Sequence, residues 1–471
     1  MNQNWHNFFE EDEYADIINR YKDMLSKKKS CYFDIHEFEN IVDYYITQND
    51  YKSAIESIEI GLVQHPNSAS LRLKFAHVLI ESGKSLKALR YISDIEKAEF
   101  YNFEVHLLKG KALNSLGKQK DANKEFSQAI KLSKEDKDDV IYDIALSFIQ
   151  IDKIHEAIKY LILAYEINES NLLVIYDLAL CYERIDEIEK SVFYYKKFLD
   201  IDPFAENIWF NLGLLYSSIN EYDNALEAYD YSIAISPENI SVYFSKADTH
   251  ISNNNFYKAI NVYNDLLEVD TENAQAYCFL GECYKKLESY KLALKNYNKA
   301  IKIDTTNPDA WFGIGMVFYS LKKYHQTINN LKKAIKIEPN SPEYWFVLGE
   351  VYSKMKMLNG SAKAYSKTLE LDPTNYKCWL AYAKVYYKKN KIGDAINILK
   401  EACQYNENIS TINYQLAAYH IYNEQPSLAY KYFEKGLSLN FREHNEVLDH
   451  FPKTKKNKNI TRLIVKYQNQ K

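Results

Sequence analysis

Residues 308–341 read PDAWFGIGMVFYSLKKYHQTINNLKKAIKIEPNS, and residues 342–375 read PEYWFVLGEVYSKMKMLNGSAKAYSKTLELDPTN. The two segments align without a gap over their whole length. Equivalent positions carry the same or closely similar side chains: Trp311 and Trp345, Gly315 and Gly349, Phe318 and Tyr352, Pro339 and Pro373. The sequence therefore contains an internal repeat with a period of 34 residues.

The same period continues in both directions from this pair. Repeats begin at residues 35, 69, 103, 138, 172, 206, 240, 274, 308, 342, 376 and 410, and only the step from 103 to 138 has 35 residues. Twelve repeats then cover residues 35–443 of the 471-residue chain. A periodic chain of this length predicts a repeat architecture rather than several unrelated globular domains.

The positions of small and large side chains within each repeat predict how it folds. Its eighth position is Gly or Ala in eleven repeats, and its twentieth is Ala, Ser or Thr in all twelve. Small side chains at these places allow two antiparallel helices to approach closely, while large apolar residues recur between them at helical spacing. A single helical hairpin of this size cannot bury its own faces, so neighbouring hairpins must stack into an all-α solenoid.

The polar stretch that ends each repeat predicts where the next helix begins. Its last residue is often Ser or Asn, whose side chains accept hydrogen bonds from the first backbone amides of a helix. The predicted N-caps are Ser68, Asn171, Asn239, Asn273, Asn307, Ser341 and Asn375.

This pattern resembles the tetratricopeptide repeat family, whose signature of an aromatic residue, Leu, Gly, Tyr, Ala and Pro at fixed positions is nearly intact in residues 308–375. The resemblance implies a right-handed α-solenoid superhelix of antiparallel helix pairs, with a concave groove lined mainly by the first helix of each repeat. Two repeats depart from the signature. Arg72 and His106 stand at the fourth position, where an aromatic residue is usual, and Lys109 stands at the Leu position.

Four regions are expected along the chain. Residues 1–34 contain a helix over 8–29 that precedes the repeats, residues 35–137 hold three divergent repeats, residues 138–443 hold nine regular repeats, and residues 444–471 form a capping helix with a basic tail. The charged run at 134–139 coincides with the inserted residue. This run is either a hinge or a solvated loop between continuous stacks.

Composition and motifs limit the possible chemistry. The net charge is −5, six cysteines are scattered without a CxxC pair, and no apolar run is long enough to span a membrane. We therefore expect a cytoplasmic protein without a membrane partner. No phosphate-binding loop, zinc-protease motif or nucleophile motif occurs, so neither catalytic activity nor a cofactor or metal is expected. His250 and His420 replace the usual Tyr and are interpreted as packed core residues rather than ligands.

The resemblance also implies where a partner would bind. In this family the groove-facing positions are mainly the second, fifth, ninth, twelfth and thirteenth of each repeat. Apolar side chains at these positions in the fourth to seventh repeats predict one strip, which we call the groove strip: Tyr142, Leu146, Ile149, Tyr176, Leu180, Phe210, Leu214 and Phe244. In the alternative interpretation, the aromatic residues at the fifth position only pack between adjacent first helices.

Three function classes follow. The leading hypothesis is a non-enzymatic scaffold that holds a protein or peptide segment in the groove by apolar anchors. A regulatory or sensor subunit of an enzyme complex is a second hypothesis. A nucleic-acid-binding repeat protein is the third, because every charged residue after Asp449 is basic. The overall acidity and the acids Asp248, Glu282 and Glu350 at groove positions weigh against it, so no nucleic-acid partner is expected.

Overall fold

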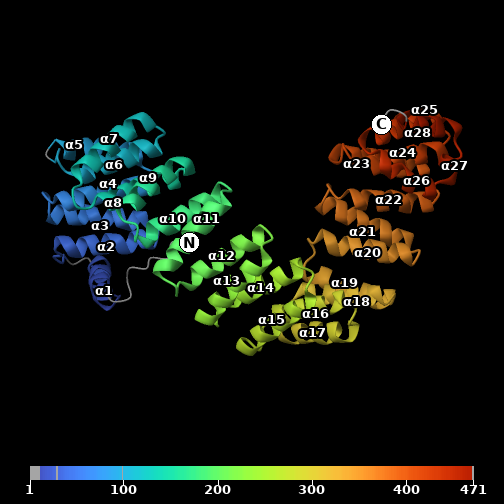
Figure 1. Ribbon diagram of the computed structural model, residues 1–471, viewed down its shortest axis with the longest axis horizontal. Helices are drawn as coiled ribbons and strands as arrows, with labels where there is room; N and C mark the ends of the chain where they lie inside the picture. Colours follow the sequence, from blue (N-terminus) through green and yellow to red (C-terminus); the bar gives the residue numbers. More distant parts are fainter. Residues whose placement is uncertain (1–10, 28–29, 98, 469–471) are drawn as a thin grey trace. The chain divides into compact units, whose positions relative to one another are not determined.

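The computed structural model describes residues 11–27, 30–97 and 99–468, which form helices joined by short turns and contain no strand. The chain divides into two compact units, Met1–Ile219 and Asn220–Lys471. Within each unit, consecutive helices lie side by side in antiparallel pairs (Figure 1). The predicted all-α solenoid of helix pairs is confirmed.

The first unit contains the N-terminal helix and the first repeats. Its helices are α1 Glu11–Lys27, α2 Ile35–Thr47, α3 Tyr51–Gln64, α4 Ala69–Glu81, α5 Ser85–Glu96, α6 Phe103–Ser115, α7 Gln119–Leu132, α8 Lys137–Gln150, α9 Ile154–Ile167, α10 Leu172–Arg184, α11 Ile188–Ile201 and α12 Glu206–Ser218. The predicted helix over 8–29 corresponds to α1, and its residues 8–10 and 28–29 lie outside the described residues.

The second unit contains the remaining repeats and the C-terminal helices. Its helices are α13 Tyr222–Ile235, α14 Ile240–Ser252, α15 Phe256–Val269, α16 Ala274–Lys286, α17 Tyr290–Ile303, α18 Pro308–Ser320, α19 Tyr324–Ile337, α20 Pro342–Lys354, α21 Leu358–Leu371, α22 Tyr376–Lys388, α23 Ile392–Tyr405, α24 Ser410–Tyr422, α25 Pro426–Leu439, η1 Phe441–Glu443, α26 His444–His450, α27 Pro452–Lys455 and α28 Lys458–Gln468. Three short helices, rather than one, therefore follow the last repeat.

Small side chains bring the two helices of a repeat together. A Cβ atom added to Gly110 would lie 2.4 Å from the ring of Phe126, and one added to Gly349 would lie 2.6 Å from the ring of Tyr365. In both repeats the glycine is the eighth residue and the ring belongs to the twenty-fourth. The ring of one helix therefore occupies the space that a larger side chain on the other helix would need.

The turn between the two helices of each repeat contains one residue in the left-handed region of the backbone map. In the described residues this is always the fifteenth residue of the repeat. These residues are Asn49, Gly83, Gly117, Asp152, Asp186, Asn220, Asn254, Glu288, Lys322, Lys356, Asn390 and Glu424. Only two of them are glycine, although glycine adopts this conformation most easily.

Most of the predicted helix caps form. The side chains of six of the seven predicted residues accept a hydrogen bond from a backbone amide of the helix that follows, and Ser341 is an N-cap residue whose hydroxyl makes no such bond. The sequence pattern missed Asp34, which begins α2 with a capping box that includes Glu37.

Arg72 and His106, which replace the aromatic residue at the fourth position, keep one contact that Trp345 makes from this position. Trp345 Nε1 donates to the Pro339 carbonyl at 2.9 Å, six residues earlier in the chain. Arg72 donates to the Pro66 carbonyl at 2.6 Å, and His106 Nε2 lies 3.1 Å from the Phe100 carbonyl. All three side chains satisfy a carbonyl in the loop before their helix, which a purely apolar ring at this position would leave unpaired.

The charged run at 134–139 lies inside the first unit. Helices α6 and α7 on one side of it pack against α8 on the other. Its role as a hinge stays a prediction.

Candidate partner-binding groove

Seven of the eight groove-strip residues lie in the first unit, on the first helices α8, α10 and α12. The eighth, Phe244, lies on α14 in the second unit. Leu214 is exposed, with 43% of its surface accessible, and the other residues of the strip are half-buried. None of the strip is part of the fully buried core.

The two tyrosines of the strip, Tyr142 and Tyr176, both contact a neighbouring helix. The Tyr142 hydroxyl on α8 donates to Asp177 Oδ2 on α10 at 2.8 Å. Burial raises the pKa of Tyr142, and the adjacent Asp177 carboxylate adds to this effect. The Tyr176 ring packs against Tyr195 and Phe198 of α11, the second helix of the same repeat, with ring centroids 6.4 and 6.5 Å apart. Tyr142 therefore connects adjacent first helices, as the packing interpretation expects, whereas Tyr176 contacts the second helix of its own repeat.

The leucines at the ninth position have a different environment. Leu146 and Leu180 are half-buried, and Leu214 is the most exposed of the three. An aliphatic side chain has no polar group that could explain its exposure, so burial against a partner would be favourable. Within the strip, these leucines are the best candidates for contact residues.

Phe244 lines a pocket of about 480 Å³ that is formed by α14, α15 and α16. Its ring contacts Phe279 edge-on, with ring centroids 5.7 Å apart, and Phe279 stacks on Tyr263. Asp248 and Glu282 line the same pocket. The other lining residues are Ser245, Ile251, Phe256, Gln275, Cys283 and Lys286.

Sequence reasoning missed Phe279 as a site residue. It occupies the sixth position of its repeat, where the other repeats carry residues of many kinds, so the period contains no signal for it. Only the approach of α16 to α14 shows that this ring completes an aromatic cluster beside two carboxylates.

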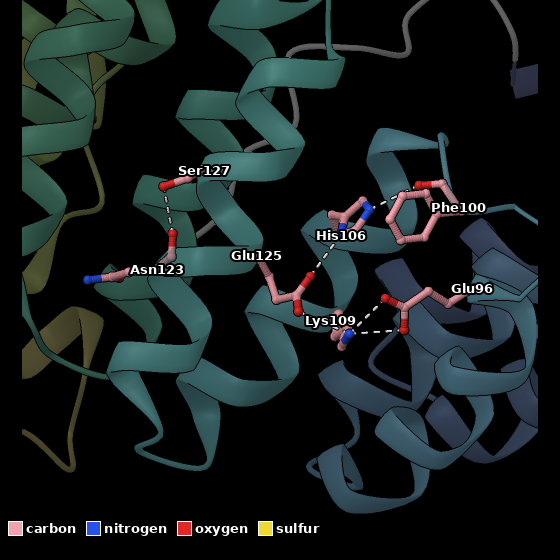
Figure 2. Close-up of polar contacts among 7 residues, drawn as sticks. All are labelled: Glu96, Phe100, His106, Lys109, Asn123, Glu125 and Ser127. Atoms are coloured by element: carbon pink, nitrogen blue, oxygen red, sulfur yellow. Dashed lines mark hydrogen bonds and ion pairs between the residues drawn. The ribbon is translucent and has the colours of Figure 1, made fainter.

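A charged cluster lies at the junction of the second and third repeats (Figure 2). Lys109 Nζ lies 2.8 Å from Glu96 Oε1 and 3.0 Å from Glu125 Oε1, and His106 Nδ1 lies 2.7 Å from Glu125 Oε2. Burial lowers the pKa of Lys109, but the hydrogen bonds to Glu96 and Glu125 outweigh it and the pKa is raised. Lys109, which departs from the family signature, is therefore paired with two acids, and one of them also contacts His106.

The same cluster is where the described residues could hold a metal ion. One ligand atom each of Glu96, His106 and Glu125 lies within 4.8 Å of the others. Imidazole and carboxylate ligands suit zinc. However, the ammonium group of Lys109 already lies between the two carboxylates, where a metal cation would bind. The ion pairs of Lys109 with Glu96 and Glu125 therefore already occupy this cluster.

The two histidines at the usual Tyr position are buried. His250 is 6% exposed and His420 is 1% exposed, and burial lowers the pKa of both imidazoles. The His420 ring stacks on Tyr432, and its Nδ1 lies 2.8 Å from Gln425 Oε1. This environment supports their interpretation as packed core residues.

Several basic side chains near the C-terminus have intramolecular partners. Lys455 pairs with Asp449 at 2.8 Å, Lys466 pairs with Glu434 at 3.6 Å, and Lys453 lies over the Tyr422 ring. These contacts weaken the argument for nucleic-acid binding by this segment.

Comparisons with known proteins agree with the fold. Family models match at residues 25–149 (tetratricopeptide repeat-like domain), 174–204 and 342–375 (tetratricopeptide repeat), 218–300 (anaphase-promoting complex, cyclosome, subunit 3), and 281–322 and 315–356 (TPR repeat). A search of curated proteins found no significant match.

No helix among the described residues is long and apolar enough to cross a membrane.

A search of solved structures also found chains to which this protein is similar. The Cut9–Hcn1 hetero-tetramer of the APC/C shares 16% identity, with a TM-score of 0.39 over 86% of this chain and 93% of that chain. YrrB, described as a TPR protein with an unusual peptide-binding site, shares 25% identity, with a TM-score of 0.32 over 38% and 93%. MamA shares 24% identity, with a TM-score of 0.32 over 34% and 94%. With its period, its helix pairs and these family matches, the chain belongs to the tetratricopeptide repeat family.

Proposed function

We propose that this protein is a non-enzymatic scaffold that binds an apolar segment of a partner protein along the groove side of its first helices. The observation that carries the proposal is the exposure of Leu214, which stands at the ninth position of its repeat, as the half-buried Leu146 and Leu180 do in the two preceding repeats. The pocket around Phe244 supports it, because aromatic side chains beside a few polar groups are typical of peptide-recognition sites.

The half-buried aromatic residues have a supporting role in this proposal. Tyr142 connects α8 to α10 through its hydrogen bond to Asp177, and the Tyr176 ring packs against α11. A partner segment bound in the first unit would therefore gain most of its contact energy from the leucines.

The double variant Phe210→Glu and Leu214→Glu tests the proposal. The matched control is Leu163→Glu with Phe193→Glu, which places the same charges on exposed apolar residues of the second helices α9 and α11 in the same unit. Affinity capture from the native host, followed by quantitative mass spectrometry, identifies proteins that the wild type and the control retain.

The groove variant is expected to lose the main partner while its circular dichroism stays unchanged. Reconstituted binding with that purified partner should weaken at least about tenfold, since buried charges oppose apolar contacts. Equal capture by the groove variant and the wild type would contradict the proposal. So would equal loss in the two double variants.

A further inference from the structure

The helices α17 and α19 carry an unusual charge. Together they contain seven lysines and no Asp or Glu, although the whole chain has a net charge of −5. All seven side chains are exposed: Lys291, Lys295, Lys299, Lys302, Lys332, Lys333 and Lys336. We call this set the lysine face.

None of these lysines lies within ion-pair distance of a carboxylate in the described residues, whereas nearby Lys285 and Lys367 pair with Glu282 and Glu370. Seven like charges on two helices repel one another, and their mutual repulsion is reduced when an anion binds. The charge of the lysine face is therefore available to a partner.

Two of the lysines are held in place by aromatic rings. Lys299 Nζ lies 4.7 Å from the centroid of the Tyr277 ring, and Lys333 Nζ lies 3.8 Å from the centroid of the Trp311 ring. Both lysines are the twenty-sixth residue of their repeat, and both rings belong to the fourth. Successive repeats thus present an ammonium group at the same place, which lowers the entropy lost when a partner binds.

The arrangement along α17 matches a helix of opposite charge. Lys291, Lys295 and Lys299 follow one another at four-residue spacing, and Lys302 continues the row. These four residues span about 16 Å along the helix axis, since each residue adds about 1.5 Å. On a partner helix, glutamates placed three or four residues apart would have the same spacing along the axis as these lysines have along α17.

We propose that the lysine face binds an acidic helical segment of a partner protein, independently of the groove. The charge is complementary, and two features favour polypeptide over nucleic acid. All seven cations are lysines, without the planar fork with which Arg contacts bases and phosphates. The rings of Tyr277 and Trp311 each already have an ammonium group over one face, which leaves less ring surface on which a base could stack.

The test uses the full-length chain and three fluorescent probes. These are a synthetic helical peptide with Glu at every third or fourth position, the same peptide with Gln in place of each Glu, and a single-stranded oligouridylate. The variant is Lys295→Gln, Lys299→Gln, Lys332→Gln and Lys333→Gln together. The matched control is Lys52→Gln, Lys120→Gln, Lys124→Gln and Lys159→Gln, four exposed lysines on second helices of the other unit.

Fluorescence anisotropy should show that the wild type and the control bind the Glu peptide and not the Gln peptide. The affinity of the lysine-face variant for the Glu peptide should be about tenfold lower. Its affinity should also change less with salt concentration, since four surface charges are removed. Three results would each overturn the proposal: no binding of the Glu peptide by the wild type, equal losses in the two quadruple variants, or binding of the oligouridylate but not of the Glu peptide.

Discussion

At the scale of single residues, the repeat tolerates several side chains wherever one physical requirement is met. The fourth position shows this, because Trp345, Arg72 and His106 all donate to a carbonyl six residues earlier. The fifteenth position shows it again. Asn, Asp, Gly, Glu and Lys all adopt the left-handed conformation there, because the turn is exposed and only the backbone is constrained.

The same substitution should therefore have opposite effects at two exposed glycines. Gly83 has a φ of 74°, and Gly393 lies in the first turn of α23; neither has an atom within 4 Å of an added Cβ. Gly83→Ala should destabilise by about 1 kcal/mol, because alanine is strained in the left-handed region. Gly393→Ala should stabilise by about 0.5 kcal/mol, because alanine favours the helix. Chemical denaturation of both variants checks the signs, and a stabilising Gly83→Ala would contradict the conformational argument.

At the scale of helices, the contacts between repeats are less uniform than the repeats themselves. Most junctions pack apolar side chains, but the junction around α6 and α7 uses the charged cluster of Glu96, His106, Lys109 and Glu125. A charged residue at a position that is apolar in the family pattern needs a partner that the pattern does not contain. The acids that pair with Lys109 are Glu96 on α5 and Glu125 on α7.

Restoring the family residue at this junction should destabilise the protein. Lys109→Leu removes the cation between Glu96 and Glu125, whose side chains are only 21% and 19% exposed. The expected loss is about 1–3 kcal/mol, because two partly buried carboxylates then lack a counter-charge. Lys124→Leu on α7 is the control, since Lys124 is 78% exposed, and it should have little effect. If Lys109→Leu raised the denaturation midpoint, the cluster would not be stabilising.

At the scale of the whole molecule, each repeat contacts mainly its neighbours along the chain. The free energy of unfolding of such a protein is approximately a sum over the repeats and the interfaces between neighbouring repeats. A destabilising substitution at one end should therefore affect mainly the repeats at that end. The end of the second unit is covered by α26, α27 and α28. Leu448 on α26 and Ile460 on α28 are buried against Tyr414, Phe433 and Leu437 of the last repeat.

A charge at this covered end should open only the last repeats. Ile460 is 1% exposed, so Ile460→Asp should cost about 3 kcal/mol or more. Amide exchange should accelerate in α24, α25 and α28 and stay unchanged in α16 and α17. Val465→Asp on the same helix is the control, because Val465 is 49% exposed. Uniform acceleration along the second unit would show that the repeats unfold together.

The amino-acid sequence by itself determined the period, the helix pairs and nearly every start of a first helix. First helices begin at the predicted residues in eleven repeats, and α8 begins at Lys137, one residue earlier than predicted. These features depend on helix caps, small residues and the spacing of apolar residues within a single 34-residue repeat. They can therefore be predicted from the local sequence. The groove strip could be named from the same period, but the period does not distinguish Tyr142, which bonds to the next repeat, from Leu214, which stays exposed.

Only the tertiary structure decided which side chains meet between helices. It paired Lys109 with Glu96 and Glu125, and it placed Phe279 beside Phe244 in a pocket. It also left the lysine face without ion-pair partners among the described residues. These outcomes depend on distances of a few ångströms between helices. The period sets which residues share a face, whereas the close approach of neighbouring helices sets which of them touch.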